Sequence, residues 1–223
     1  MTTDGTAHPF WPFFGLSVRT PRLELRYAND ALLEELAVLH AAGVVRPGTE
    51  PFDGNATFYQ PGPGTTRWLK GQWSARSRTS PEWWVLVFAA VVDGRPVGGQ
   101  EMSGIEFPMV RSVSSFSWLG REHQGKGLGK EMRAAVLHLA FAGLGARRAE
   151  SEAFDDNPAS QAVSRALGYE PDGSYYAPRP SGAGRMSRFA LSREKWQRTQ
   201  HRHDIDIEGL QPCLDHLGLD ESS

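Results

Sequence analysis

The chain has 223 residues, a formal net charge of −2 at neutral pH and one cysteine, Cys213. This length suits one domain with a sizeable core, and the small negative charge argues against a protein that binds nucleic acid through bulk positive charge. A single cysteine rules out an internal disulfide framework and favours a reducing cytoplasm. No signal-peptide pattern opens the sequence, and the longest apolar run, residues 83–92, is too short to span a bilayer.

Residues 1–15 begin loosely and then place four aromatic residues around Pro12, too many for an ordinary disordered tail. We expect this aromatic arm to pack on its own domain, with a lid or a contact between subunits of a homo-oligomer as the alternatives. Apolar and polar residues alternate from Leu16 to Tyr27, as they do in half-buried strands. Thr20-Pro21 interrupts this alternation, so we expect a break in the strand there.

Two helices and a long loop are predicted next. Asp30 is a good N-cap for a helix that runs through His40 with leucines along one face. Residues 44–64 contain four prolines and four glycines and predict a long loop. Long loops inside compact domains are more often functional than accidental. Apolar residues at helical spacing then predict a second helix over residues 66–78.

The rest of the chain predicts alternating strands and helices. Asp93-Gly94 lies between two β-rich runs and indicates a hairpin, because this dipeptide favours a two-residue turn. Asn157-Pro158 is an N-cap followed by a proline at the first helical position, and Gly168 ends the helix that begins there. The expected elements are strands over residues 83–92, 96–107 and 113–119, a helix over 128–143, a strand over 147–154, a helix over 157–167 and a hairpin over 173–191.

A glycine-rich turn lies between a predicted strand and a predicted helix, with Gly125, Gly127 and Gly129 at alternate positions. Glycine permits positive φ and lets a ligand approach the backbone closely. The N–H groups of such a turn, together with the positive end of the helix dipole, favour anions such as pyrophosphate. The spacing differs from the G-x-G-x-x-G fingerprint of the nucleotide fold, and the Ser or Thr of a P-loop is missing. A glycine-rich turn without a ligand is the plainer alternative.

The order Gln-x-x-Gly-x-Gly, from Gln124 to Gly129, resembles the acyl-CoA pyrophosphate loop of the GNAT acyltransferase superfamily. The segment 20–26 and the pattern of Asn157 and Ser160 ahead of Gly168-Tyr169 resemble the RimJ/RimL-type branch of that superfamily. The resemblance covers a domain at residues 16–192 and implies an α+β fold, with helices on both sides of a mixed, mostly antiparallel sheet. Residues 193–223 are a C-terminal extension without a readable motif.

In that superfamily the fourth and fifth core strands, here residues 114–119 and 148–154, separate, and acyl-CoA lies in the gap between them. A backbone N–H near Trp118 or Leu119 would then polarise the thioester carbonyl, as an oxyanion donor does. For the lysines of the loop, an ordinary solvated surface charge is the alternative role. The donor-binding residues that the resemblance implies are Trp118, Leu119, Gly120, Gln124, Gly125, Lys126, Gly127, Leu128, Gly129, Lys130, Asn157, Ser160 and Ser164.

The catalytic residues that we expect are Ser160 and Glu101. Many GNAT members place a tyrosine four residues after the serine position to protonate the leaving thiolate, but Ser164 stands there, so Ser160 is the better candidate by resemblance. The attacking amine must be neutral, which calls for a general base. Glu101 and Glu106 lie on the same predicted strand, and alternation puts them on opposite faces. Glu101 is our choice, and His123 is a third option.

The expected function is direct transfer of an acyl group from acyl-CoA to a primary amine of a small molecule or of a protein N-terminus, without a metal ion. Acetyl-CoA is the default donor. Strings such as residues 131–137 resemble an actinobacterial subgroup that includes succinyl-CoA-using members, so succinyl-CoA is the rival donor. A non-catalytic sensor or scaffold domain that binds acyl-CoA is the alternative from another class. The cluster of His201, His203 and Asp204 lies outside the domain and is not expected to bind metal.

Overall fold

The structure is a computed structural model that describes residues 8–53, 57–60 and 62–219. Its strands are β1 (Ser17–Arg19), β2 (Glu24–Tyr27), β3 (Trp83–Val92), β4 (Arg95–Ile105), β5 (Ser112–Leu119), β6 (Arg148–Phe154), β7 (Glu170–Arg179), β8 (Gly182–Ser192) and β9 (Asp206–Glu208). Its α-helices are α1 (Asp30–Ala42), α2 (Pro63–Ser77), α3 (Phe107–Val110), α4 (Leu128–His138), α5 (Pro158–Ala166) and α6 (Arg193–Thr199).

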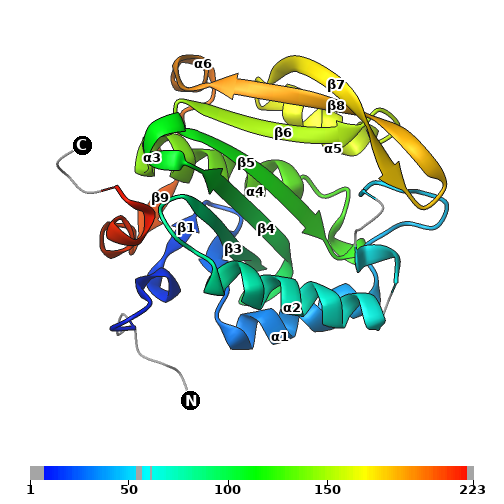
Figure 1. Ribbon diagram of the computed structural model, residues 1–223, viewed down its shortest axis with the longest axis horizontal. Coiled ribbons are helices and arrows are strands. Elements are labelled where there is room, and N and C mark those ends of the chain that lie inside the picture. Colours follow the sequence, from blue (N-terminus) through cyan, green and yellow to red (C-terminus); the bar gives the residue numbers. More distant parts are fainter. Residues whose placement is uncertain (1–7, 54–56, 61, 220–223) are drawn as a thin grey trace.

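Within the described residues, nine strands form one sheet in the order β7-β8-β6-β5-β4-β3-β2-β1-β9. Neighbouring strands are antiparallel except β5 and β6, which are parallel (Figure 1). The mixed, mostly antiparallel α+β sheet expected from the sequence is therefore confirmed. The break at Thr20-Pro21 separates β1 from β2, and these two short strands pair with each other.

Several predicted boundaries differ from the structure, and three of them have a clear local reason. Asn29, not Asp30, caps α1, because its side chain accepts a hydrogen bond from an N–H group of the first turn at 3.0 Å. Helix α2 begins earlier than predicted, at Pro63, since proline suits the first turn of a helix. Strand β4 ends at Ile105, because Glu106 has a left-handed conformation with φ of 48° and starts a short helix.

The two faces of the sheet carry separate hydrophobic clusters, because neighbouring residues of a strand point to opposite sides. On β3, Trp84, Leu86 and Phe88 belong to the larger cluster, together with the buried side of α4. Val87 and Ala89 belong to a smaller cluster with residues of α1 and α2. Helices α1 and α2 thus cover one face, and α4 and α5 cover the other (Figure 1).

Both segments outside residues 16–192 contribute to the same core. In the N-terminal arm, Phe13 is fully buried and stacks on Tyr27 with ring centroids 5.5 Å apart. In the C-terminal segment, β9 pairs with β1 at the edge of the sheet, and Cys213 and Leu217 are fully buried. The C-terminal segment therefore extends the sheet and the core. No helix within the described ranges is long and apolar enough to cross a membrane.

Candidate active site

Strands β5 and β6 are paired only at their beginnings. Their ladder joins Ser112–Ser114 with residues 148–150. Beyond that point β5 remains paired with β4 as far as Leu119, and β6 remains paired with β8 as far as Phe154. Each strand stays paired with its other neighbour, but β5 and β6 no longer pair with each other. A gap therefore opens between their two facing backbone edges. The sequence predicted this separation at the same two strands.

The backbone of β5 directs N–H groups into the gap at alternate residues. Gly120 N–H donates to Val97 O of β4 at 3.0 Å. The carbonyl oxygen of Trp118 also lies on the β4 side, 2.2 Å from the place where a Cβ on Gly98 would stand. Since backbone groups alternate between the two edges of a strand, the N–H of Leu119 faces the gap. Of the two residues considered as oxyanion donors, Leu119 has the suitable orientation.

The side chain of Trp118 belongs to the core under α1 and α2. Its ring lies 5.8 Å from the ring of Trp68 and 5.6 Å from that of Phe58. The following Gly120 packs closely on α1, because a Cβ there would stand 2.5 Å from Cδ1 of Leu39 and would force that side chain to shift. These contacts fix the end of β5 and the start of the glycine turn.

The glycine turn leaves its N–H groups free. Gly125 and Gly127 have φ of 77° and 78°, a conformation that residues with a side chain rarely adopt. Within the described part of the chain, no N–H group from Gly125 to Lys130 donates a hydrogen bond. Among the described residues, a Cβ added to Gly125 would have only Arg46 within 4 Å, at 3.9 Å, so this part of the chain leaves the space beside the turn open. Unpaired donors at a helix N-terminus fit phosphate groups.

Gln124 holds the turn in this shape. Its Nε2 donates to Leu119 O at 3.0 Å and to Val44 O at 2.8 Å, and its Oε1 accepts from Arg46 Nε at 2.9 Å. Both amide hydrogens are therefore used within the protein. Gln124 positions the turn through these bonds, which gives the glutamine ahead of the glycines a structural role.

Two arginines that sequence reasoning missed bring positive charge to the turn. Arg22 Nη2 donates to Lys126 O at 2.8 Å, and its Nη1 lies 3.1 Å from the Cβ position of Gly127. Arg46 reaches the turn from the α1–α2 loop. Both lie far from the turn in sequence, so no local pattern signals them. Lys130 is exposed and has no ion-pair partner among the described residues.

Helix α5 carries the two serines considered from the sequence, Ser160 and Ser164, and the two differ in solvent exposure. Asn157 Oδ1 accepts from the N–H of Ser160 at 3.2 Å, the N-cap bond expected from the sequence. Ser160 is partly exposed. Ser164 is fully buried, with its hydroxyl 3.4 Å from that of Ser151 on β6, and Arg133 of α4 donates to Ser151 at 2.6 Å. Protein therefore encloses the Ser164 hydroxyl, and Ser160 has the more accessible one.

Glu101 lies on the face of the sheet that α1 and α2 cover. It stands between Val87 of β3 and Phe116 of β5 in the ladder. Gln72 Nε2 of α2 donates to Glu101 Oε1 at 3.3 Å. Desolvation, offset only in part by the Gln72 hydrogen bond, raises the pKa of Glu101 to about 7. Beside it, the half-exposed ring of Phe116 lies 5.5 Å from that of Phe52 in the α1–α2 loop.

The other two candidate bases lie in exposed turns. Glu106 follows the end of β4, is exposed and caps α3 in a left-handed conformation. His123 lies in the turn after β5, where its Nε2 is 3.4 Å from Glu122 Oε1. Neither shares the desolvated setting of Glu101.

The histidines of the C-terminal segment pack against aromatic rings. The ring of His201 lies 5.0 Å from Trp196 and 4.7 Å from His203. Among the residues that the structure describes, no group of three or more His, Cys, Asp or Glu side chains is arranged to hold a metal ion.

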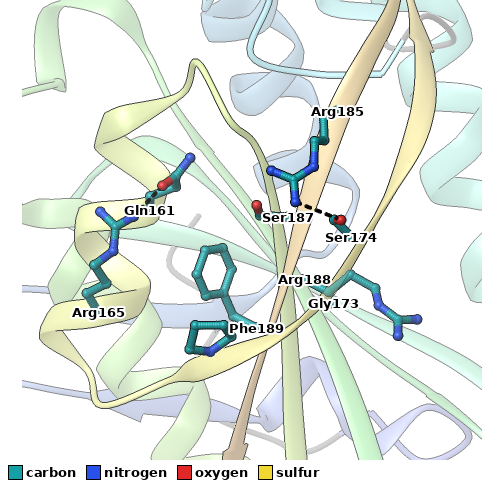
Figure 2. Close-up of a pocket in the computed structure, with 9 residues that line it drawn as sticks. Gln161, Arg165, Gly173, Ser174, Arg185, Ser187, Arg188 and Phe189 are labelled. Atoms are coloured by element: carbon teal, nitrogen blue, oxygen red, sulfur yellow. Dashed lines mark hydrogen bonds between the residues drawn. The ribbon is translucent and has the colours of Figure 1, made fainter.

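A cavity of about 480 Å³ lies apart from the gap, between α5 and the β7–β8 hairpin (Figure 2). Phe189 occupies its middle, with Gln161 and Arg165 on one side and Arg185 on the other (Figure 2). Arg185 pairs with Asp155 at 2.8 Å, and Arg165 donates to Gln161 Oε1. These two guanidinium groups are engaged by neighbouring side chains, unlike the free N–H groups of the glycine turn.

The sheet is mixed, and its two parallel strands separate to leave a gap. A glycine turn follows the first of these strands and leads into the N-terminus of a helix. Together these features define the class of GNAT acyltransferases. Residues 22–170 match the acetyltransferase (GNAT) domain family, and the chain belongs to this family. The protein is therefore an N-acetyltransferase by family.

Solved structures of low sequence identity share the fold. RimJ from Mycobacterium smegmatis, in complex with a CoA disulfide, is 20% identical over 84% of this chain and 91% of its own, with a TM-score of 0.63. RimL, a ribosomal L7/L12 α-N-protein acetyltransferase in complex with CoA, is 19% identical over 79% and 97%, with a TM-score of 0.61. The spermidine/spermine N-acetyltransferase SpeG from Vibrio cholerae is 15% identical over 81% and 99%, with a TM-score of 0.62.

Proposed function

We propose that the protein transfers an acetyl group from acetyl-CoA directly to a primary amine. The observation that carries this proposal is the row of N–H groups from Gly125 to Lys130, which have no acceptor among the described residues and lie at the mouth of the gap between β5 and β6. The pyrophosphate of CoA would accept hydrogen bonds from these groups. The pantetheine arm would lie between the unpaired edges of the two strands, as a peptide does when it adds to a sheet.

Leu119, Glu101 and Ser160 have distinct roles in this proposal. The N–H of Leu119 donates to the thioester oxygen as negative charge develops on it. The amine nitrogen attacks the carbonyl carbon, the C–S bond breaks with its electron pair on sulfur, and Glu101 takes the proton of the amine. A base with a pKa of about 7 has the right basicity for this step near neutral pH. Ser160, at the N-terminus of α5, would donate a proton to the leaving thiolate and regain one from the solvent that its partly exposed hydroxyl reaches.

The acceptor would enter on the side of the gap that Glu101 faces. Two aromatic rings, Phe52 and Phe116, border that side, and the α1–α2 loop carries the first of them. The fold is shared by enzymes that their names describe as acting on a ribosomal protein or on spermidine. At such identity this likeness favours neither acceptor, so both a protein N-terminus and a small amine remain in the proposal.

Acetyl is the donor group that the surroundings support better. A succinyl group ends in a carboxylate, which requires a cation or several donors when buried. Arg76 of α2, a natural candidate, pairs with Asp30 at 2.6 Å. Arg111, between α3 and β5, donates to Pro108 O at 3.1 Å and to Leu144 O at 3.4 Å. Succinyl-CoA stays as the rival donor.

The proposal is tested by measuring release of free CoA thiol from acetyl-CoA and from succinyl-CoA with three sets of acceptors: N-terminal peptides, polyamines and amino acids. We expect turnover with acetyl-CoA and at least one set. Tight binding of CoA without turnover on any acceptor would contradict the proposal and support a sensor domain. A higher kcat/KM with succinyl-CoA would replace acetyl by succinyl.

A further inference from the structure

A buried histidine near the end of α1, His40, has no part in the proposed chemistry, yet both of its ring nitrogens have a hydroxyl partner. The residue is 2% exposed. Its Nδ1 lies 2.9 Å from Thr65 Oγ1 in the first turn of α2, and its Nε2 lies 3.2 Å from Thr57 Oγ1 in the α1–α2 loop. One ring therefore joins both helices to the loop between them.

The ring of His40 is neutral near pH 7. Burial lowers the pKa of His40 from its ordinary value of 6.5 to about 4. A neutral imidazole has one donor and one acceptor nitrogen, and a hydroxyl can be the partner of either. The two threonine hydroxyls therefore satisfy the ring in both tautomers. A residue that cannot bond at the Nε2 position would lose the link to the loop.

The hydroxyl that meets Nε2 belongs to a short helical turn, Thr57–Tyr59, which carries two aromatic rings. Phe58 of this turn is buried, and its ring centroid lies 4.7 Å from that of His40. The Tyr59 hydroxyl accepts from the N–H of Phe52 at 2.8 Å and donates to Phe52 O at 2.7 Å. The turn thus fixes Phe52 as well as Phe58.

These two phenylalanines reach the acceptor side of the gap. The ring centroids of Phe52 and Phe58 are 4.5 Å apart, and they lie 5.5 and 6.0 Å from that of Phe116 on β5. Phe116 is the partner of Glu101 in the β4–β5 ladder. An unbroken series of contacts therefore runs from the His40 ring to the opening beside the proposed base.

We propose that His40 is a positioning residue for the amine acceptor, because it holds Phe52 and Phe58 where they border the opening beside Glu101. The inference rests on the proposed function, which places the amine on that side of the gap. An aromatic wall that is already in place need not be ordered when the amine binds. Loss of the bond between His40 and the loop should therefore weaken binding of the amine and leave the KM for acetyl-CoA unchanged.

Thr57→Val and Thr65→Val are a matched pair, because each removes one hydroxyl from the His40 ring and keeps the shape of the side chain. With one accepted amine, Thr57→Val should raise the KM for the amine about tenfold and leave kcat and the KM for acetyl-CoA within about twofold. Thr65→Val, which changes only the bond to α2, should leave all three values within about twofold. Equal KM values for the amine in the two variants would overturn the inference.

Two amide substitutions of the histidine test the same link. Glutamine can place its amide near the Nε2 position and keep the bond to Thr57, whereas asparagine is shorter and reaches only the Nδ1 position beside Thr65. The KM for the amine should stay within about threefold in His40→Gln and rise about tenfold in His40→Asn. His138→Asn, at a buried histidine of α4 that packs on Trp196, is the control and should leave this KM unchanged. Equal values in the two His40 variants would show a merely structural role.

Limited proteolysis with chymotrypsin measures the position of the loop without any reaction. Cleavage after Phe52 or Phe58 should be about fivefold faster in Thr57→Val and His40→Asn than in the unmodified protein, and unchanged in Thr65→Val. Unchanged cleavage in every variant would overturn the inference and leave the proposed function standing. If the unmodified protein turns over no amine, the proposed function fails, and the acceptor role of His40 fails with it.

Discussion

The two sides of the gap between β5 and β6 are built from different chemical groups. On the donor side, main-chain N–H groups from Gly125 to Lys130 donate no hydrogen bond to any residue that the structure describes, and no side chain is needed to supply them. On the acceptor side, the base that we propose is a single carboxyl, that of Glu101, in a setting made by Gln72 and Phe116. The donor side therefore depends on backbone conformation, and the acceptor side depends on the identity and solvation of a few side chains.

This difference decides which substitutions should matter on each side. A backbone site tolerates changes of side chain but not a residue that alters φ or fills the turn. A site built on a side chain tolerates changes in the neighbouring residues, but it does not tolerate loss of the side chain that takes the proton. Substitutions that change one side and spare the other can therefore separate donor binding from chemistry.

The largest effect is expected on the acceptor side. Glu101→Gln keeps the shape of the side chain and removes the base, so kcat should fall by about 10²- to 10⁴-fold with the KM for acetyl-CoA little changed. The measurement is steady-state kinetics with one accepted amine. Glu106→Gln, just after the end of the same strand and exposed, is the control and should keep full activity. An equal fall of kcat in both variants would show that Glu101 is not the general base.

The next effect is expected on the donor side. Gly127→Asp places a side chain and a negative charge at a position with φ of 78°, beside the free N–H groups. The Kd for CoA, measured by calorimetry, should rise by about 100-fold or more, because repulsion replaces several charge-assisted hydrogen bonds. Gly48→Asp is the matched control, since Gly48 also has positive φ, 76°, with nothing near its Cβ position. An unchanged Kd in a folded Gly127→Asp variant would contradict the donor site.

Glu101 should also link activity and stability to pH. Its folded pKa of about 7 lies above the ordinary value of 4.5, so the folded state binds this proton more tightly than the unfolded chain does. The stability that this proton contributes is complete below pH 4.5 and is lost as pH rises through 7. Activity changes in the opposite direction, because the base must be ionised, so kcat/KM should rise with pH through about 7.

Urea unfolding of Glu101→Gln at pH 5 and pH 8 checks that link. The variant should gain up to about 3 kcal/mol relative to the unmodified protein at pH 8, and little at pH 5, because one pKa unit corresponds to about 1.4 kcal/mol. A difference in stability that does not change with pH would show that Glu101 titrates with an ordinary pKa.

The smallest effect separates the two serines of α5. Ser160→Ala should lower kcat about tenfold with KM for acetyl-CoA unchanged, because proton donation to the thiolate acts late in the reaction. Ser164→Ala should leave kcat within about twofold and lower the free energy of unfolding by about 1 kcal/mol, since it removes a buried hydrogen bond to Ser151. The reverse result, with Ser164→Ala the slower enzyme, would assign the acid to the buried hydroxyl.

The contrast between backbone and side-chain sites also explains what the sequence could predict. The glycine turn is a local pattern, so Gln124, Gly125, Gly127 and the helix behind them could be placed from spacing alone. The N-cap at Asn157 is local too, and its bond to the Ser160 N–H is present. Backbone sites are encoded by neighbouring residues, so the local shape of the turn and of this helix cap could be predicted, and CoA binding at the turn stays a prediction.

The parts that could not be predicted depend on contacts between distant segments. Arg22 meets the turn from 104 positions away, and Gln72 reaches Glu101 across 29 positions. Strand β9 pairs with β1 and becomes the last strand of the sheet, although no motif in its segment signals this. The sequence placed Glu106 on the same strand as Glu101, but the left-handed backbone of Glu106 ends β4 before it.

The most direct test of the account is a titration of the ¹⁵N-labelled protein with CoA, followed by NMR through the amide signals. The account predicts that the amide signals of residues 125–130 and of Leu119 shift most, since these N–H groups are free and face the proposed ligand. The signals of α1 should move little. Saturable binding that shifts other amides and leaves those of residues 125–130 unchanged would contradict the central claim.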